Sequence, residues 1–144
     1  MKLRIKNFKD LSLYELYDIL KLRTDVFVVD QACPYPELDD KDQEAIHLWL
    51  EEDGRIQIYC RILKDPKGKE VYIGRVVTRL EGRGLGKRIM EEVIGYIIEN
   101  LACENISLEA QTYAIGFYEK CGFEVVSQPF DMDGIDHVKM TMEV

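Results

Sequence analysis

The sequence predicts one α/β domain in which helices cover both faces of a mixed sheet. The chain has 144 residues, 47% of them apolar, so a single domain spanning residues 1–144 can bury a core without disulfide or metal staples. No internal repeat, low-complexity tract or linker divides it. Its strand-like and helix-like stretches follow the order β-α-β-β-β-α-β-α-β-β, which is not the regular alternation of a parallel sheet.

The first third of the chain predicts a strand, a long helix and an acidic loop. Residues 3–6 alternate apolar and charged side chains, as a half-buried strand does. Ser12 and Glu15 have the spacing of a capping box, and apolar residues then recur at helical spacing, which predicts a helix over residues 12–29. Residues 30–45 carry two prolines and six acidic side chains, so this stretch is a loop, and it is too long for a simple connection.

The remaining two thirds predict three strands, a helix, a strand, a short helix and two closing strands. Asp53-Gly54 and Pro66-Lys67-Gly68 are turn signals between strands. An apolar helical stripe begins after Lys87, and Gly122 stands where a helix commonly ends. The expected strands are residues 46–50, 55–63, 71–78, 106–110, 123–126 and 137–142, and the expected helices are residues 87–101 and 112–120.

Composition disfavours several classes of function. The 19 basic and 27 acidic residues give a formal charge of −8, which opposes a nucleic-acid partner. No apolar run approaches the ~20 residues of a spanning helix, and the N-terminus lacks the apolar segment of a signal peptide. We therefore expect no membrane partner and a cytoplasmic location. The four cysteines are scattered without a CxxC pair, so we expect reduced thiols and no bound metal.

A glycine-rich loop predicts an anion site. The strand end Val76-Val77-Thr78 is followed closely by Gly82-Arg83-Gly84-Leu85-Gly86, and a helix begins at once. Glycines let the backbone approach a ligand, and the start of a helix attracts negative charge. Arg83, Lys87 and Arg88 add positive charge in an otherwise acidic chain. A turn without a ligand is the alternative, whereas a Walker A loop would need Ser or Thr after Lys87, and the spacing departs from the dinucleotide pattern G-x-G-x-x-G.

The stretch from Ala110 to Phe123 is the most specific string in the chain. Its residues predict an amphipathic helix with a glycine cap and a following strand. Phe117 and Phe123 are typical core residues. Tyr118 is either a core residue or a phenol that supplies a proton.

Together, the strings EGRGLGKRIM and AIGFYEKCGF resemble the GNAT superfamily of N-acetyltransferases. The resemblance implies the acyl-CoA N-acyltransferase fold, with a central, mostly antiparallel sheet between helices. It also implies acetyl-CoA as co-substrate, with a backbone N–H near Val76 or Val77 directed at the thioester carbonyl by a β-bulge, and Tyr118 as the acid that protonates the departing thiolate. Matched by position, the residues for acetyl-CoA are Val76, Val77, Thr78, Gly82, Arg83, Gly84, Leu85, Gly86, Lys87, Arg88 and Gln111.

Two further strings are similar to the ElaA-like branch of this superfamily and extend the resemblance to nearly the whole chain. They are VFVVDQACPYPELDDKDQEAIHL near the start, with the pattern Y-x-E-x-D-x-x-D, and DMDGIDHVKM near the end. One departure is Glu81, which stands where the family usually has Arg or Gln and would oppose a pyrophosphate by its charge. Arg79 fits an alternative register of the glycine loop, R-x-x-G-x-G.

The resemblance places the acceptor pocket beside the first helix and the acidic loop. Glu37, Asp39 and Asp42 are candidates to hold a cationic amine, and the alternative for each is a solvated loop carboxylate. Gln31, Tyr35 and the two histidines, His47 and His137, are the other candidates for the pocket. A histidine at a strand edge is more often structural, so this alternative stays open for both.

These observations predict an enzyme that transfers an acetyl group from acetyl-CoA to a primary amine of a small molecule or peptide, directly, in a ternary complex. A homodimer is a common form in the superfamily. One alternative is a CoA- or metabolite-binding module of the same fold without turnover, which Glu81 favours. The other is a nucleotide-binding protein, which would bind NAD or ATP and not CoA.

Overall fold

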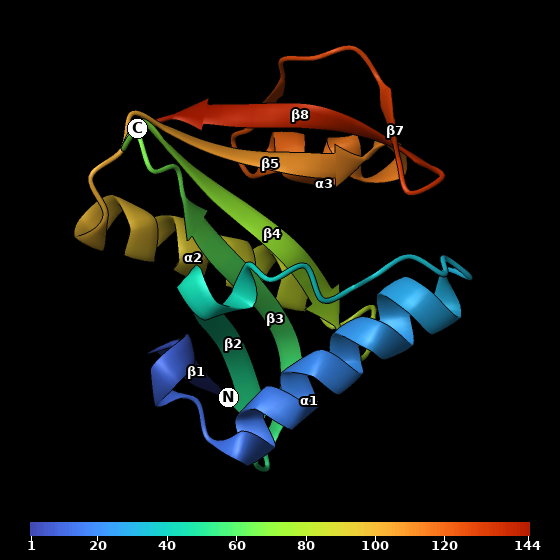
Figure 1. The fold of residues 1–144 in the computed structure, drawn as a ribbon. Coiled ribbons are helices and arrows are strands. Elements are labelled where there is room, and N and C mark those ends of the chain that lie inside the picture. The colour runs from blue at the N-terminus through green and yellow to red at the C-terminus, as the bar shows by residue number, and fades with distance from the viewer.

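A computed structural model describes residues 1–144 and shows one eight-stranded sheet with helices on both faces (Figure 1). The strands are β1 (Lys2–Asn7), β2 (Ile46–Glu52), β3 (Arg55–Lys64), β4 (Glu70–Thr78), β5 (Asn105–Gln111), β6 (Glu124–Val125), β7 (Phe130–Met132) and β8 (Ile135–Glu143). The helices are α1 (Leu13–Arg23), α2 (Leu85–Asn100) and α3 (Ile115–Lys120). The sheet runs in the order β1-β2-β3-β4-β5-β8-β6, and β7 pairs with β8 outside this path.

The predicted elements are present, with small shifts at their ends. Ser12 forms the predicted capping box with Glu15 at the start of α1. The long first helix continues past α1, but as a π-helical segment over Thr24–Asp30. The first turn of the short third helix, Thr112–Ala114, is a 3-10 helix. The single helix predicted over residues 112–120 is thus a 3-10 turn followed by α3.

One strand, β7, was not predicted. It forms a hairpin with β8 through Asp133-Gly134, and both residues have positive φ, 54° and 82°. Asp53-Gly54, with φ of 54° and 74°, makes the same kind of turn between β2 and β3. Positive φ at both central residues is the two-residue hairpin turn for which Asp-Gly is typical. The signal was therefore present at Asp133-Gly134, but the strand before it is too short to show a pattern.

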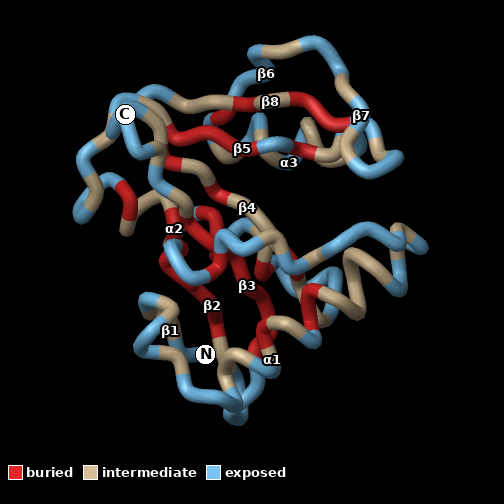
Figure 2. Tube along the Cα trace, viewed as in Figure 1, coloured by how far each residue is buried: buried red, intermediate tan, exposed pale blue.

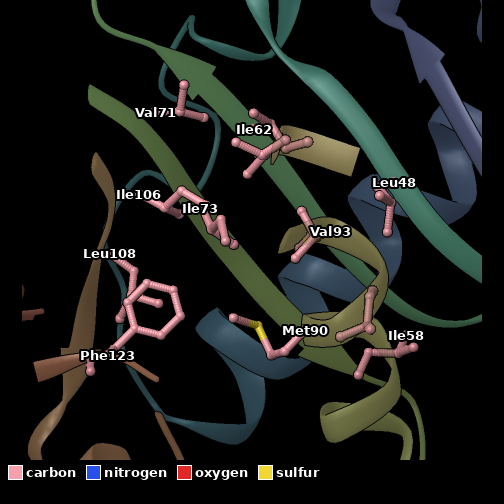
Figure 3. Close-up of a cluster of buried hydrophobic side chains, with 14 of the residues drawn as sticks. Leu48, Ile58, Ile62, Val71, Ile73, Met90, Val93, Ile106, Leu108 and Phe123 are labelled. Carbon is pink, nitrogen blue, oxygen red and sulfur yellow. The ribbon is translucent and has the colours of Figure 1, made fainter. Parts of the chain in front are cut away.

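Side chains of successive strand residues point to opposite faces of the sheet, and the buried ones form a core on each face. The larger cluster, 19 buried residues, lies between the sheet and α2, and Figure 3 shows Met90 and Val93 of α2 among its strand residues. The smaller cluster packs α1 on the opposite face and is made of Ile19, Leu22, Trp49, Ile56, Tyr59 and Val77. Figure 2 shows the buried residues concentrated along the central strands. None of the helices is long and apolar enough to span a membrane.

A β-bulge in β4 exchanges the faces of that strand. Val71 and Ile73 belong to the larger core, whereas Val77 belongs to the smaller core on the other face. Residues an even number of positions apart share a face in a regular strand, so one residue must be extra. The register confirms this, because Tyr59 pairs with Val77 and Arg61 with Gly74, which leaves one residue of β3 opposite two of β4.

The sheet divides between β4 and β5. These two strands are parallel and pair only at three positions, Glu70–Tyr72 of β4 with Asn105–Ser107 of β5. Beyond these pairs they diverge (Figure 1), while β5 stays paired with β8 over its whole length. The second half of β4, which contains the bulge, therefore has no strand partner on its β5 side.

Candidate functional site

The glycine loop has the geometry of an anion site. Gly82 and Gly84 have positive φ, 80° and 70°, and Gly84 is the N-cap of α2. The first amides of a helix have no acceptor within it, so those of residues 85–87 are free for a ligand. The side chains of Arg83, Lys87 and Arg88 are exposed beside them. Arg83 makes one contact, with Glu52 at 3.4 Å, between two side chains that both reach solvent.

The glycine loop and the tyrosine motif meet at Gly86. A β-carbon on Gly86 would lie 3.1 Å from Cζ of Phe117, which is tighter than side chains normally tolerate. Leu85 is buried in the larger core, so this first turn of α2 is fixed on the side away from solvent. The two strings that carry the resemblance are thus in contact, although 31 positions separate Gly86 from Phe117.

Tyr118 of α3 is packed between two aromatic rings. Phe117 and Phe123 contact it edge-on, with ring centroids 5.0 and 6.3 Å away. Its hydroxyl makes no hydrogen bond within the protein. Burial raises the pKa of Tyr118 well above its usual value, and the neighbouring Cys60, Cys121 and Tyr113 add to the shift. The phenol therefore stays protonated at neutral pH and has a proton to donate.

The bulge lies in the unpaired half of β4, at Arg75. This residue has φ of +52°, a left-handed conformation that costs an L-residue about 1–2 kcal/mol. Val76 packs against the larger core and Val77 is buried in the smaller one. Thr78 donates from Oγ1 to the carbonyl of Leu80 at 2.9 Å and so closes the turn that follows β4. These residues border the divergence of β4 and β5; that they line a pantetheine chain stays a prediction.

Two of the predicted acceptor residues, Gln31 and His137, meet Gln111, which was predicted for acetyl-CoA, where β5 ends. Gln111 Nε2 donates to Gln31 Oε1 at 3.4 Å and so connects β5 to the end of the π-helical segment. His137 pairs with Gln111 across β5 and β8. Its Nδ1 donates to the carbonyl of Ile135 at 2.7 Å, and its ring stacks on Phe130. Nε2 of His137 is therefore the ring nitrogen left for a ligand.

The acidic loop approaches the same end of the sheet. Cys33 donates from Sγ to the carbonyl of Asp133 at 3.0 Å, which joins the loop to the β7–β8 hairpin. Tyr35, two residues on, is half exposed and makes no side-chain hydrogen bond. It is placed on the loop but does not contact Gln31, Gln111 or His137 through any hydrogen bond.

The acidic residues of the loop are bound by three arginines that the sequence analysis did not identify. Glu37 accepts from Arg23 Nε at 2.9 Å and from Arg75 Nε, and Asp39 accepts from Arg61 Nη1 at 2.9 Å. Asp42 Oδ1 accepts from Arg23 Nη1 at 2.7 Å and from Arg61 Nη1 at 3.0 Å. We call these six side chains the arginine–carboxylate network; its members are Arg23, Glu37, Asp39, Asp42, Arg61 and Arg75.

The network explains the E-x-D-x-x-D part of the acidic string. Hydrogen bonds and charge from Arg61 outweigh burial and hold the pKa of Asp39 well below its usual range, and Arg23 does the same for Asp42. The carboxylates that we expected to hold a cationic amine are therefore already neutralised within the protein. Arg23 and Arg61 are almost fully buried, and a buried guanidinium in an apolar stretch requires such a partner. That requirement is the signal in the sequence that could have revealed the network.

The position of His47 disagrees with the expectation that this residue contacts the acceptor. It is 0% exposed, and both ring nitrogens are engaged. Nε2 donates to the carbonyl of Asp42 at 2.9 Å, and since a carbonyl only accepts, Nδ1 accepts from the hydroxyl of Tyr59 at 2.7 Å. Burial lowers the pKa of His47, so the ring is neutral. The alternative reading, a satisfied structural histidine, fits this geometry.

The alternative loop register through Arg79 is not supported. The guanidinium of Arg79 donates to Asp18 Oδ1 of α1 and to the carbonyl of Ile56, both at 2.8 Å. It therefore fixes α1 to the sheet and is not free for a phosphate. Glu81 is exposed and makes no ion pair. No group of three His, Cys, Asp or Glu side chains is arranged to hold a metal ion.

Comparison with known proteins agrees with the fold and identifies its family. Residues 19–144 match the family model described as an acetyltransferase (GNAT) domain. A UPF0039 protein of Mycobacterium tuberculosis is 39% identical over 137 residues, which cover 92% of this chain and 86% of the relative. The Escherichia coli protein ElaA is 34% identical over 140 residues, which cover 94% of this chain and 92% of ElaA.

Two crystal structures superpose closely on this one. The structure of Escherichia coli ElaA has a TM-score of 0.91 at 31% identity, and that of an acyl-CoA N-acyltransferase from Pseudomonas aeruginosa has 0.89 at 36%. Each superposition covers 99% of both chains. With a family model over most of its length and relatives of this identity, the chain belongs to the GNAT acetyltransferase family, in the branch that contains ElaA.

Proposed function

We propose that this protein transfers an acetyl group from acetyl-CoA to a primary amine, directly, within a ternary complex. The observation that carries the proposal is the contact of the anion-binding loop with the helix of Tyr118, through Gly86 and Phe117, beside the divergence of β4 and β5. An anion site, an extended unpaired strand edge and a protonated phenol are then adjacent. A long ligand with a phosphate end and a thioester end needs these three features in that combination.

Different parts of the chain bind different parts of acetyl-CoA. Gly84, Leu85 and Gly86 offer backbone amides at the start of α2 to the pyrophosphate, and Arg83, Lys87 and Arg88 add charge. Val76, Val77 and Thr78 offer backbone groups along the unpaired edge of β4, and Gln111 adds a side-chain amide at the end of β5.

In the transfer step, the amine nitrogen attacks the thioester carbonyl carbon, so that a C–N bond forms and the C–S bond breaks. The carbonyl oxygen carries negative charge during the attack, and an amide N–H of Val76 or Val77 at the bulge stabilises it. The nitrogen releases one proton to solvent or to a base, and the sulfur takes up one proton. The products are an acetylated amine and CoA.

Tyr118 supplies the hydrogen bond to the departing sulfur. A free thiol has a pKa of about 8.5, below the raised pKa of the phenol. The phenol therefore acts first as a donor that stabilises the thiolate, and solvent restores the proton that the thiol finally carries. The acceptor amine approaches from the side of Gln31, Tyr35 and His137, whose Nε2 is free to accept its proton.

Calorimetric titration with acetyl-CoA, CoA, NAD and ATP tests the proposal. We expect binding of the two CoA species and none of NAD or ATP. K87Q/R88Q should weaken CoA binding, whereas K67Q/K69Q, which removes two exposed charges from the turn between β3 and β4, should not. Absence of CoA binding would overturn the proposal. CoA binding without acetyl transfer to any amine in a screen with thiol detection would favour the module without turnover, and Glu81 would then be the first position to change.

A further inference from the structure

The arginine–carboxylate network ends on the one residue that forms the bulge. Glu37 accepts from Arg75 twice, through its carboxylate from Nε and through its carbonyl from Nη2 at 3.2 Å. Asp39 Oδ2 accepts from the same Nη2 at 3.4 Å. The side chain of Arg75 is three-quarters buried in these contacts. The acidic loop therefore holds the bulge through its contacts with the side chain of Arg75.

Arg75 has a conformation that needs such a grip. Five residues other than glycine have positive φ, and Ala32, Asp40, Asp53 and Asp133 all lie in turns or loops. Arg75 is the one within a strand. A left-handed residue persists where its surroundings hold it there, because its own backbone preference opposes it.

The two carboxylates that contact Arg75 are themselves bound by buried arginines. Glu37 forms an ion pair with Arg23 of α1, and Asp39 forms one with Arg61 of β3. Asp42 contacts both of these arginines, so that it connects the two supports. Both Nη atoms of Arg61 donate to Asp39 or Asp42, whereas its Nε is buried without a hydrogen-bond partner, so only these carboxylates orient the guanidinium. The position of Arg75 is thus fixed by α1, β3 and the loop together.

We propose that Glu37 and Asp39 are positioning residues for acyl transfer, which hold Arg75 in its left-handed conformation and so keep the bulge amide in place for the thioester carbonyl. The inference rests on the proposed function, and it assigns these two carboxylates a task other than holding the acceptor amine. They touch neither substrate. They act through the backbone of β4.

Substitution of Arg75 by glycine tests this positioning role, because glycine adopts positive φ without contacts that hold it there. R75A and R75G both remove the grip, but R75A keeps the backbone cost. We expect R75A to lower kcat by at least about tenfold, since loss of an oxyanion donor costs ~10²–10³, and R75G to retain much more of it. E37Q should lower kcat with little change in KM for acetyl-CoA, and E37Q/R75G should recover most of that loss.

A second measurement does not depend on turnover. A residue with positive φ gives a strong Overhauser contact between its own amide and α-protons in NMR spectra of the free protein. We expect that contact at Arg75 in the wild type and its weakening in E37Q. E70Q is the matched control, because it removes an ion pair of β4 with Lys139 at the far end of the strand. It should leave both kcat and the Arg75 signal unchanged.

Two results would overturn the inference. One is equal kcat in R75A and R75G, and the other is a loss in E37Q that appears in KM for the amine and is not rescued by R75G, as expected of an amine-binding carboxylate. Failure of the wild type to bind acetyl-CoA would instead overturn the proposed function, and the Arg75 signal would still show whether Glu37 holds the bulge. Circular dichroism of each variant excludes unfolding as the cause.

Discussion

Tyr118 is the residue on which we expect turnover to depend most directly. Its hydroxyl has no partner in the protein, and Phe117 and Phe123 fix its ring. We expect Y118F to lower kcat by ~10²-fold or more, as loss of a hydrogen-bond donor to charge that develops in the transition state does, while the affinity for CoA stays unchanged because the ring packing is kept. Thiol-release kinetics and calorimetry measure the two quantities. Equal losses in binding and turnover would mean that the ring only packs. Y113F changes a mostly exposed phenol on the same segment and is the control.

Two glycines of α2, the N-cap Gly84 and the internal Gly95, should change the stability of the protein in opposite directions when replaced by alanine. Gly84 has φ of +70°, so G84A should lower the free energy of unfolding by about 1–2 kcal/mol and weaken CoA binding. Gly95 lies inside α2 with no atom within 4 Å of an added β-carbon, so G95A should raise stability by up to ~1 kcal/mol. Urea unfolding measures both. Similar losses in the two variants would show that the loop conformation is not what G84A disturbs.

At this scale the sequence located residues better than it assigned their tasks. Gly86 contacts the helix that carries Tyr118, and Gln31 and His137 both meet Gln111, because each lies in a local pattern that the chain itself specifies. The positions of His47, Glu37 and Asp39 depend on partners far along the chain, such as Tyr59 and Arg75. No spacing rule along one chain can identify such partners.

Among the elements, α1 is the one whose stability depends most clearly on a local signal. Ser12 Oγ accepts from the amide of Glu15, and Glu15 accepts from the amide of Ser12 and from Lys6 of β1. We expect S12A to lower the free energy of unfolding by roughly 0.5–2 kcal/mol, as loss of an N-cap does. CoA affinity should not change, because the cap lies at the end of α1 away from the acidic loop. Urea unfolding tests the first part; a loss of CoA affinity without a loss of stability would contradict it.

The elements that escaped prediction are those that two strands or two helical forms define together. The bulge at Arg75 was implied only by the resemblance, near Val76 or Val77, and not by the residues themselves, because a bulge exists only in relation to the paired strand β3. β7 is three residues long and exists only as the partner of β8. The π-helical segment has the apolar spacing of an ordinary helix, so the sequence could not distinguish them.

For the whole molecule, stability should fall as the pH falls, in two stages. The folded-state pKa of His47 is lowered, so the unfolded chain binds a proton that the folded chain refuses, and stability is lost below about pH 6.5. The pKa values of Asp39, Asp42, Glu15 and Glu70 are also lowered, so their contribution is present above about pH 4 and is lost below it. His47 faces Tyr59, Asp42, Arg23 and Arg61.

The H47Q variant isolates the first stage. Each protonation can change the free energy of unfolding by up to ~1.4 kcal/mol per pH unit. We expect the wild type to lose stability between pH 7 and pH 5 and H47Q, whatever its absolute stability, to show a smaller slope over that range. Urea unfolding at a series of pH values measures both slopes. Equal slopes would exclude His47 as the group responsible.

The divergence of β4 and β5 leaves two open edges in the middle of a sheet. Edge strands attract other strands, and proteins commonly shield them with charge, proline or a covering segment. The unpaired half of β4 reads Ile73-Gly74-Arg75-Val76-Val77-Thr78, with one charge and no proline. A ligand lying along this edge would act as the missing shield. The substrate-free protein should therefore self-associate on mild heating more readily than the ligand-bound protein, so that acetyl-CoA would also serve this protein as a protectant against aggregation.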